Sequence, residues 1–137
     1  MNIAPTNTAH PAAIGLVIYA KDLARMADFY AQVLGLQVLE QDAGFVLLGG
    51  EGAEIAIVRI PEEIAATILI ATPPVLREDT PLKHSFLVAD LAATRERVIA
   101  AGGGTQPPDT AWEWRGQRHL DGFDPEGNVL QLREVRR

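Results

Sequence analysis

Cysteine is absent from the 137-residue sequence, and long hydrophobic runs are absent as well. Without cysteine, disulfide bonds, thiolate nucleophiles and zinc–thiolate centres are excluded. The longest apolar run, "IAATILIA", is far shorter than the roughly 20 residues that a membrane helix requires. The N-terminal "MNIAPTNTAHPAA" lacks the basic and hydrophobic regions of a signal peptide. We therefore expect a cytoplasmic protein with no membrane partner.

Positive charge is also scarce. The chain has 12 Lys and Arg against 18 Asp and Glu, which gives a formal net charge of −6. Because a nucleic-acid backbone requires a positive protein surface, we expect no nucleic-acid partner. Hydrophobic residues make up 47% and charged residues 22% of the chain, as in ordinary globular domains. The length suits one domain, or two small modules that share one core.

The first half predicts a strand, a helix and three further strands. Residues 14–20, "IGLVIYA", are apolar and branched, as in a strand buried on both faces. Asp22 can cap the helix that follows, in which apolar residues recur at helical spacing. Gly35 can end this helix in the left-handed conformation. The three strands expected next are 36–41, 45–50 and 54–60.

The second half repeats this order, so the repeat organises the whole sequence. A strand at 84–89 precedes Asp90 as the helix cap, and the glycines at 102–104 end the helix. "DPEG" predicts a type I turn before the last strand. The three strands expected after the second helix lie around 110–116, 117–123 and 128–135.

We align the two halves with one residue fewer in the second. This alignment pairs Gly15 with His84 and Ala56 with Gln131. The proline-rich linker between the halves can be a short helix, or an extended piece on the sheet or on another subunit. One compact domain is expected overall, with these parts: a mobile N-terminal tail (1–12), a first βαβββ module (13–59), the linker (60–82) and a second βαβββ module (83–137).

Two stretches, "DLARMADFYAQVLGLQV" and "DPEGNVLQL", resemble the vicinal oxygen chelate superfamily, which includes glyoxalase I, bleomycin-resistance and extradiol-dioxygenase proteins. The resemblance extends from about residue 12 to residue 134. It implies an α+β fold of paired βαβββ modules. Their eight strands would form a curled mixed sheet around a cavity, with the helices on the convex face. It also implies a small-molecule ligand and, together with the apolar linker, a homodimer.

The resemblance further implies where a metal would be bound. Metal-using members carry ligands early in the first strand and in the last strand of each half. These points correspond to Gly15, Ala56, His84 and Gln131. A catalytic metal usually keeps about three protein ligands, and Gly and Ala have no ligating side chain. We therefore expect no metal cofactor. The alternative is a divalent metal such as Zn, Ni, Mn or Fe, held by His84 and Gln131.

Strand alternation extends these positions to a candidate pocket. If Gly15 faces the cavity, Tyr19 does too, and by the same rule Phe86 accompanies His84 while Arg133 accompanies Gln131. His84 is the best candidate for a catalytic group, since the unperturbed pKa of histidine is about 6.5. The residues predicted to bind the ligand are Tyr19, Glu54, His84, Phe86, Trp112, Gln131 and Arg133.

Structural roles for these residues stay open. Tyr19 and Phe86 can fill the core, and Glu54 can form a solvated ion pair with Arg133. Trp112 and Trp114 share one strand face and can cover a sheet edge or a subunit contact instead of a ligand. His119 and Asp121 also share strand parity, which suits an orienting pair near the pocket or a position at its rim.

The predicted function is metal-independent binding or sequestration of a small amphipathic organic molecule. Two enzymatic alternatives remain. One is a metal-dependent lyase or dioxygenase that uses His84 and Gln131. The other is a metal-free enzyme in which His84 acts as acid or base beside Glu54 or Arg133.

Overall fold

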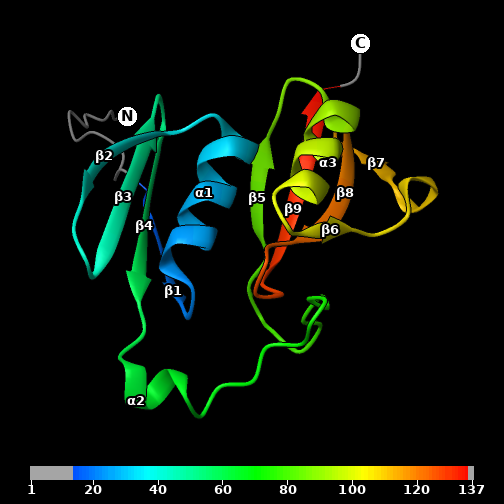
Figure 1. The fold of residues 1–137 in the computed structure, drawn as a ribbon. Coiled ribbons are helices and arrows are strands. Elements are labelled where there is room, and N and C mark those ends of the chain that lie inside the picture. Colours follow the sequence, from blue (N-terminus) through cyan, green and yellow to red (C-terminus); the bar gives the residue numbers. More distant parts are fainter. Residues whose placement is uncertain (1–13, 136–137) are drawn as a thin grey trace, which may run out of the picture.

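The computed structural model describes residues 14–135, so the predicted tail at 1–12 lies outside the described residues. Two similar modules lie side by side (Figure 1). The elements of the first module are β1 (Leu16–Ala20), α1 (Leu23–Leu34), β2 (Gln37–Gln41), β3 (Phe45–Gly50) and β4 (Ala53–Arg59). Those of the second are β5 (His84–Leu87), α3 (Leu91–Ala100), β6 (Gly104–Thr105), the 3₁₀ turn η1 (Pro108–Thr110), β7 (Trp112–Trp114), β8 (Gln117–Phe123) and β9 (Val129–Val135).

Each module has its own sheet. The strand order is β1-β4-β3-β2 in the first sheet and β5-β9-β8-β6 in the second, where β7 also pairs with β8. In each sheet the first strand runs parallel to the last, and the other pairings are antiparallel. The predicted α+β class and its mixed strands are therefore confirmed. Within residues 14–135 the two sheets are not hydrogen-bonded to each other, and the short β6 adds a ninth strand to the expected eight.

Aspartate side chains start the two long helices, as the repeat predicts. Asp22 accepts a hydrogen bond from the backbone N–H of Arg25 at 3.1 Å, and Asp90 accepts one from Ala93 at 3.0 Å. These bonds satisfy amides that have no partner inside the helix. Gly35 ends α1 with a φ of 68°, a left-handed conformation that costs glycine little.

One face of each sheet is covered by a helix, and the face on the other side is called its outer face here. α1 packs on β3 and β4 and also contacts α3, so it lies between the two sheets (Figure 1). The apolar side chains of these helices and of the inward-facing strand positions form the core. Its largest fully buried members include Met26, Phe29, Leu48, Ile57, Val98, Leu120, Leu130 and Leu132.

The turn between β8 and β9 joins the two modules. Buried Asp124 accepts a hydrogen bond from the Tyr30 hydroxyl of α1 at 2.7 Å. The Glu126 carboxylate accepts from the backbone N–H groups of Lys21 and Asp22 at 2.9 and 2.8 Å. Because both carboxylates belong to "DPEG", the turn that the sequence predicts also holds the first module in place.

The linker is mainly extended. After the short helix α2 (Glu62–Ala65), it runs without regular structure to β5. The Lys21 ammonium donates to the carbonyl of Ile68, and the backbone N–H of Arg77 donates to Gly127 at 2.9 Å. The linker is therefore attached to both modules. None of the helices in residues 14–135 is long and apolar enough to cross a membrane.

Candidate functional site

The strand register decides which side chains share a face. Val17 pairs with Ala56 in the first sheet, and Ser85 pairs with Gln131 in the second, whereas His84 pairs with Leu130. The Ser85 hydroxyl also donates to the Gln131 amide oxygen at 2.6 Å. Since paired residues on adjacent strands project to the same side, His84 and Gln131 project from opposite sides of their sheet. The expectation that they share a face is corrected by this register.

The physical reason for this correction is that the repeat needs no gap. Val17 and Ser85 each precede their helix-capping aspartate by the same interval, and their partners Ala56 and Gln131 are equivalent. Gly15 is then equivalent to Lys83 and not to His84. The metal-ligand position that the resemblance implies early in the second module therefore carries a lysine.

Phe86 lies with the core. It shares the helix-covered face with its partner Leu132, and its ring centroid is 6.4 Å from that of Tyr30 in an edge-on arrangement. This placement agrees with the core-filling role considered for Phe86. It also separates the ring from Gln131, which projects from the outer face.

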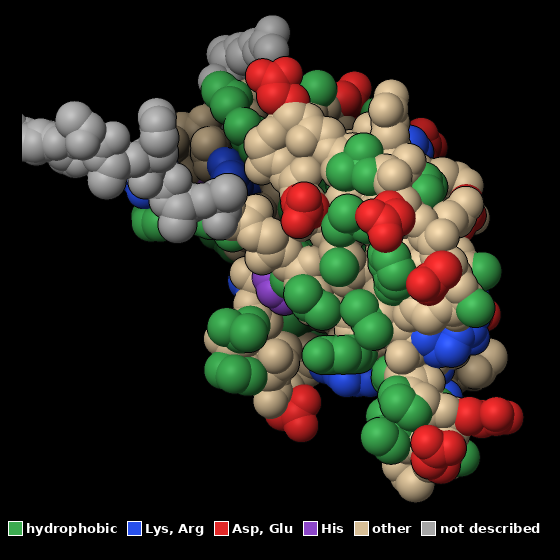
Figure 2. Space-filling view, turned by 90° about the vertical axis from the view of Figure 1, so that its left-hand side faces the viewer, with side chains coloured by type: hydrophobic (Ala, Val, Ile, Leu, Met, Phe, Trp, Pro, Cys, Tyr) green, Lys and Arg blue, Asp and Glu red, His purple; other side chains and the backbone are tan. Residues whose placement is uncertain are grey.

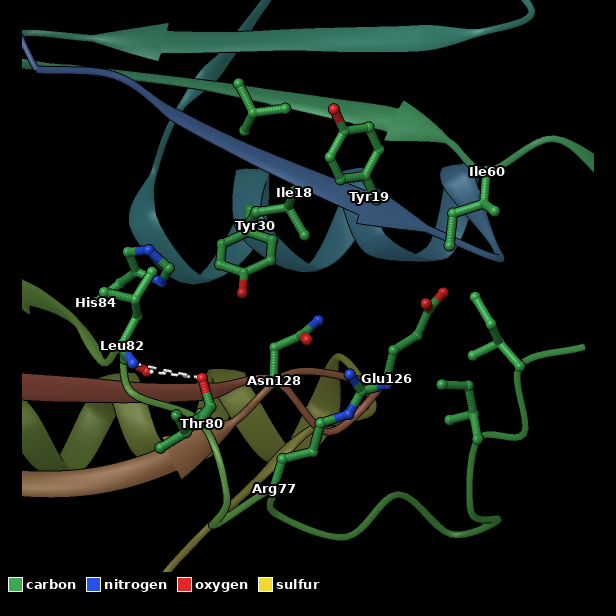
Figure 3. Close-up of a pocket in the computed structure, with 14 residues that line it drawn as sticks. Ile18, Tyr19, Tyr30, Ile60, Arg77, Thr80, Leu82, His84, Glu126 and Asn128 are labelled. Carbon is green, nitrogen blue, oxygen red and sulfur yellow. Dashed lines mark hydrogen bonds between the residues drawn. The ribbon is translucent and has the colours of Figure 1, made fainter. Parts of the chain in front are cut away.

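A pocket of about 380 Å³ lies at the seam between the two modules and the linker (Figure 3). It is called the seam pocket here. The structure brings two predicted ligand-binding residues together there, Tyr19 of the first module and His84 of the second. Other residues that line the seam pocket are Val17, Ile68, Leu82 and Asn128.

Polar and apolar side chains line different parts of the seam pocket. Figure 3 shows Tyr30, Asn128 and Glu126 pointing toward one space from two sides, with His84 at one end. Asn128 donates from its side-chain nitrogen to Asp124 at 2.9 Å, so its position is fixed. Ile60, Ile68 and Ile70 of the linker supply part of the apolar lining. Such a lining suits a molecule with one polar and one apolar end.

Burial changes the acid–base properties of the groups beneath this pocket. Burial raises the pKa of Asp124, and this effect outweighs its hydrogen bonds from Tyr30, Asn128 and Glu126, which lower the pKa. Burial likewise raises the pKa of the Tyr30 hydroxyl, and the neighbouring Asp124 charge raises it further. Tyr30 therefore stays protonated and serves as a hydrogen-bond donor.

Three other predicted residues lie together elsewhere, on the outer face of the second sheet. Trp112, Gln131 and Arg133 share this face because Trp112 pairs with His119, which pairs with Arg133. Lys83 joins them, with its ammonium 3.1 Å from the Asp121 carboxylate. The group is called the second-sheet face here; its residues are Lys83, Ser85, Trp112, Trp114, Gln117, His119, Asp121, Gln131 and Arg133.

Sequence reasoning did not include Lys83 in the candidate site. A gapless alignment of the two halves is the signal that finds it, because this alignment places Lys83 and Asp121 on one face with Gln131. His119 and Asp121, considered as an orienting pair, do share that face.

Glu54 lies apart from Arg133. Glu54 belongs to β4 and pairs with Gly49 in the first sheet, whereas Arg133 belongs to β9 in the second. Arg133 donates instead to the Ser85 hydroxyl at 2.9 Å and to the Gln117 amide oxygen at 3.3 Å. The expected ion pair between Glu54 and Arg133 is not formed. The reason is that β4 and β9 belong to different sheets, and the register makes Arg133 equivalent to Val58 and not to Glu54.

A divalent metal does not fit the residues that the structure places together. His84 and Gln131 project to opposite sides, and Lys83 occupies the repeat position of Gly15. Within residues 14–135, no group of three or more His, Asp or Glu side chains is placed to hold a metal ion. Two groups on opposite faces cannot complete the roughly three-ligand set of a catalytic site. His84 and Gln131 are therefore not the two halves of one metal site.

Comparisons with known proteins agree with this fold. A family model described as a glyoxalase-like domain matches residues 15–133. A comparison with curated protein sequences gives no match. A glyoxalase/bleomycin resistance protein/dioxygenase family enzyme from Burkholderia phytofirmans PsJN is 20% identical, with a TM-score of 0.67 over 90% of this chain and 99% of that chain.

Fosfomycin resistance proteins also have similar structures. FosX from Mesorhizobium loti is 15% identical, with a TM-score of 0.65 over 92% of this chain and 93% of that chain. FosX from Listeria monocytogenes, solved with Mn(II) and sulfate ion, is 14% identical, with a TM-score of 0.67 over 93% of this chain and 92% of that chain. At such identities these likenesses establish the fold and leave the ligand open.

Proposed function

Because the chain belongs to the glyoxalase-like domain family, we propose that it binds a small amphipathic organic molecule, and that it does so without a metal ion. The observation that supports this proposal most directly is the seam pocket. Its volume of about 380 Å³ lies in the range of small-molecule sites. In this proposal Tyr19 and His84 contact the ligand from the two modules.

The chemistry of the lining supports an amphipathic ligand. Half-buried His84 and Asn128 offer hydrogen bonds at one side of the pocket, and apolar Ile68 and Leu82 of the linker cover another part. Apolar contacts supply affinity in such sites, and a few fixed polar groups orient the ligand. Within residues 14–135, no three His, Asp or Glu side chains are placed to hold a metal ion together, which supports the metal-independent form of the proposal.

The proposal extends to a homodimer. The outer face of the first sheet is apolar: Val17, Tyr19 and Leu39 are 56%, 66% and 57% exposed. Figure 2 shows hydrophobic side chains gathered over that side of the molecule, with acidic side chains among them. Exposed apolar patches of this kind mark interaction surfaces in soluble proteins. A second copy of the chain is the proposed cover.

The test of binding is a thermal-shift screen of metabolites and antibiotics with protein dialysed against a chelator. We expect at least one amphipathic compound to raise the melting temperature of the metal-free protein in a saturable way, because ligands that bind the native state stabilise it. Binding that appears only after Zn, Ni, Mn or Fe is restored would contradict metal-independent binding.

Variants then assign the site. His84→Ala should weaken binding of the selected compound by about tenfold, as expected when one hydrogen bond to a ligand is lost. Gln32→Ala, on the exposed side of α1, is the matched control and should bind as the parent does. Unchanged binding in His84→Ala would remove the seam pocket from the proposal.

A further inference from the structure

The outer faces of the two modules differ in chemistry at equivalent positions. The first module carries apolar residues where the second carries polar or charged ones. The equivalent pairs, first module before second, are Val17 and Ser85, Ala56 and Gln131, Leu47 and Asp121, and Phe45 and His119. Because the first module folds in the same way with apolar residues, the fold does not require this polar set.

Lys83 extends over the middle of this face. Its ammonium lies 3.1 Å from Asp121 Oδ2 and 5.4 Å from the centre of the Trp112 ring. Both contacts stabilise a positive charge there, one by ion pairing and one through the electrons of the aromatic ring. An ammonium has three donors, and the Lys83 side chain is 39% exposed. A ligand can therefore reach this cation from solvent.

Two polar atoms beneath Lys83 lack partners. His119 is only 2% exposed, and its Nδ1 is buried without a hydrogen bond, as is Asp121 Oδ1. Buried polar atoms without partners are rare in folded proteins and call for an explanation. His119 and Asp121 are alternate residues of β8 and project to the same side. If Asp121 is released from Lys83, its carboxylate can accept a hydrogen bond from His119.

A second cation and an aromatic wall complete the face. Arg133 is held by Ser85 at 2.9 Å and by Gln117 at 3.3 Å, which fixes the plane of its guanidinium group. The Trp112 and His119 rings stack with centroids 5.3 Å apart, and the neighbouring Trp114 is 61% exposed. Lys83 and Arg133 contribute two positive charges here and Asp121 contributes one negative charge. This part of the face is therefore positive, although the net charge of the chain is −6.

We propose that the second-sheet face is a binding site for a small planar organic acid, whose carboxylate takes the place of Asp121 on the Lys83 ammonium. The displaced Asp121 then turns to His119, and the ring of the acid lies against the tryptophans. Arg133 supplies the second positive charge. The Lys83 ammonium is thus the positive group that binds the carboxylate of the ligand. The second-sheet face is separate from the seam pocket, so binding there does not depend on the proposed function.

The two tryptophans of the chain are Trp112 and Trp114, so intrinsic tryptophan fluorescence reports on this face alone. The probe is para-nitrobenzoate, a planar acid that quenches tryptophan on contact, and the matched uncharged probe is para-nitrobenzyl alcohol. We expect saturable quenching by the acid, with an affinity about tenfold above that of the alcohol, because a charge-assisted hydrogen bond is lost in the alcohol.

Two variants at the ion pair should change the affinity in opposite directions. Lys83→Met should weaken the acid to the level of the alcohol. Asp121→Asn should tighten the acid several-fold, because the internal competitor for Lys83 is removed. Arg59→Met, which removes the same charge on β4 of the first sheet, is the control and should leave the affinity unchanged.

The outcomes that overturn the inference are non-saturable quenching, equal affinity for acid and alcohol, or unchanged affinity in Lys83→Met. A fold defect in Lys83→Met would be recognised by circular dichroism. In that case the salt dependence of the unmodified protein decides: added NaCl should weaken the acid and leave the alcohol unchanged, since only the acid depends on charge. An acid that is insensitive to NaCl would also overturn it.

Discussion

At the scale of single residues, Asp124 shows how a buried charge is tolerated. The carboxylate is fully buried and accepts hydrogen bonds from the Tyr30 hydroxyl, from the backbone of Glu126 and from both the backbone and the side chain of Asn128. Burial still raises its pKa. A raised pKa in the folded state means that the contribution of Asp124 to stability is greatest below its ordinary pKa. That contribution is lost as the pH rises through the folded-state pKa.

Tyr30→Phe tests this balance. The change removes the hydroxyl that donates to Asp124 and leaves the ring in the core, so the free energy of unfolding near pH 7 should fall by about 2 kcal/mol. The pKa of Asp124 should rise further, because the Tyr30 hydrogen bond lowers it. The loss in the free energy of unfolding should therefore be smaller at about pH 4, where the Asp124 carboxyl is more often neutral. Urea unfolding at the two pH values measures both effects.

Tyr19→Phe is the control for this experiment, since Tyr19 is 66% exposed. Its unfolding free energy should match that of the parent within about 0.5 kcal/mol. A loss in Tyr30→Phe that is equal at both pH values would contradict the coupling between Tyr30 and Asp124.

Single residues were the hardest part of the site to predict. Tyr19 and His84 were expected at a pocket and do line one, but His84 was placed on the face of Gln131. One inserted gap caused this, because side chains alternate along a strand and a shift by one residue exchanges its faces. The strand itself was predicted correctly, since its apolar composition does not depend on that shift. Lys83 was missed for the same reason.

At the scale of elements, helix starts and strands were predictable because each has a local signal. Asp22 and Asp90 accept the capping bonds that their positions suggest. The linker has no such signal. Its course depends on distant contacts, such as that of Arg77 with Gly127 at 2.9 Å, which no pattern within the linker reveals.

Gly127→Ala tests how the linker is held. A Cβ at Gly127 would lie 2.5 Å from the carbonyl oxygen of Val75, and the φ of 84° is strained for alanine. The linker should therefore detach, and trypsin should cut after Arg77 faster than in the parent. Gly52→Ala is the matched control, because Gly52 has a φ of 76° with nothing within 4 Å of the added Cβ. Equal cleavage in the two variants would mean that strain alone, and not contact with the linker, matters.

At the scale of the whole molecule, the resemblance implied the α+β class, and the repeat predicted the order of strands and helices in the two halves. The separation of the sheets was not predicted. The pattern of apolar residues along a strand indicates which of its faces is buried. It does not indicate whether the edge strands β1 and β5 pair with each other. In the structure each remains at an edge, and the two modules are joined through α1, Asp124 and Glu126.

The proposed homodimer is tested by the mass of the protein in solution. Sedimentation should give twice the chain mass of 14.8 kDa. Val17→Asp places a carboxylate on the outer face of the first sheet and should weaken the dimer by at least about tenfold, since an unpaired buried charge is costly. Ala24→Asp adds the same group on the exposed side of α1 and should not. A monomer at all concentrations would exclude the dimer.

The equivalence of Gly15 and Lys83 also makes the first module a scaffold for protein engineering. A Cβ at Gly15 would meet its nearest neighbours, Glu54 O and Glu54 Oε1, at 3.7 and 4.0 Å, which are ordinary contact distances. A lysine introduced there would have a carboxylate within reach, as Lys83 has Asp121. The second module therefore carries an ammonium–carboxylate pair, and the first module has an equivalent backbone position without one. An ion pair engineered at Gly15 can be compared with the natural pair within the same protein.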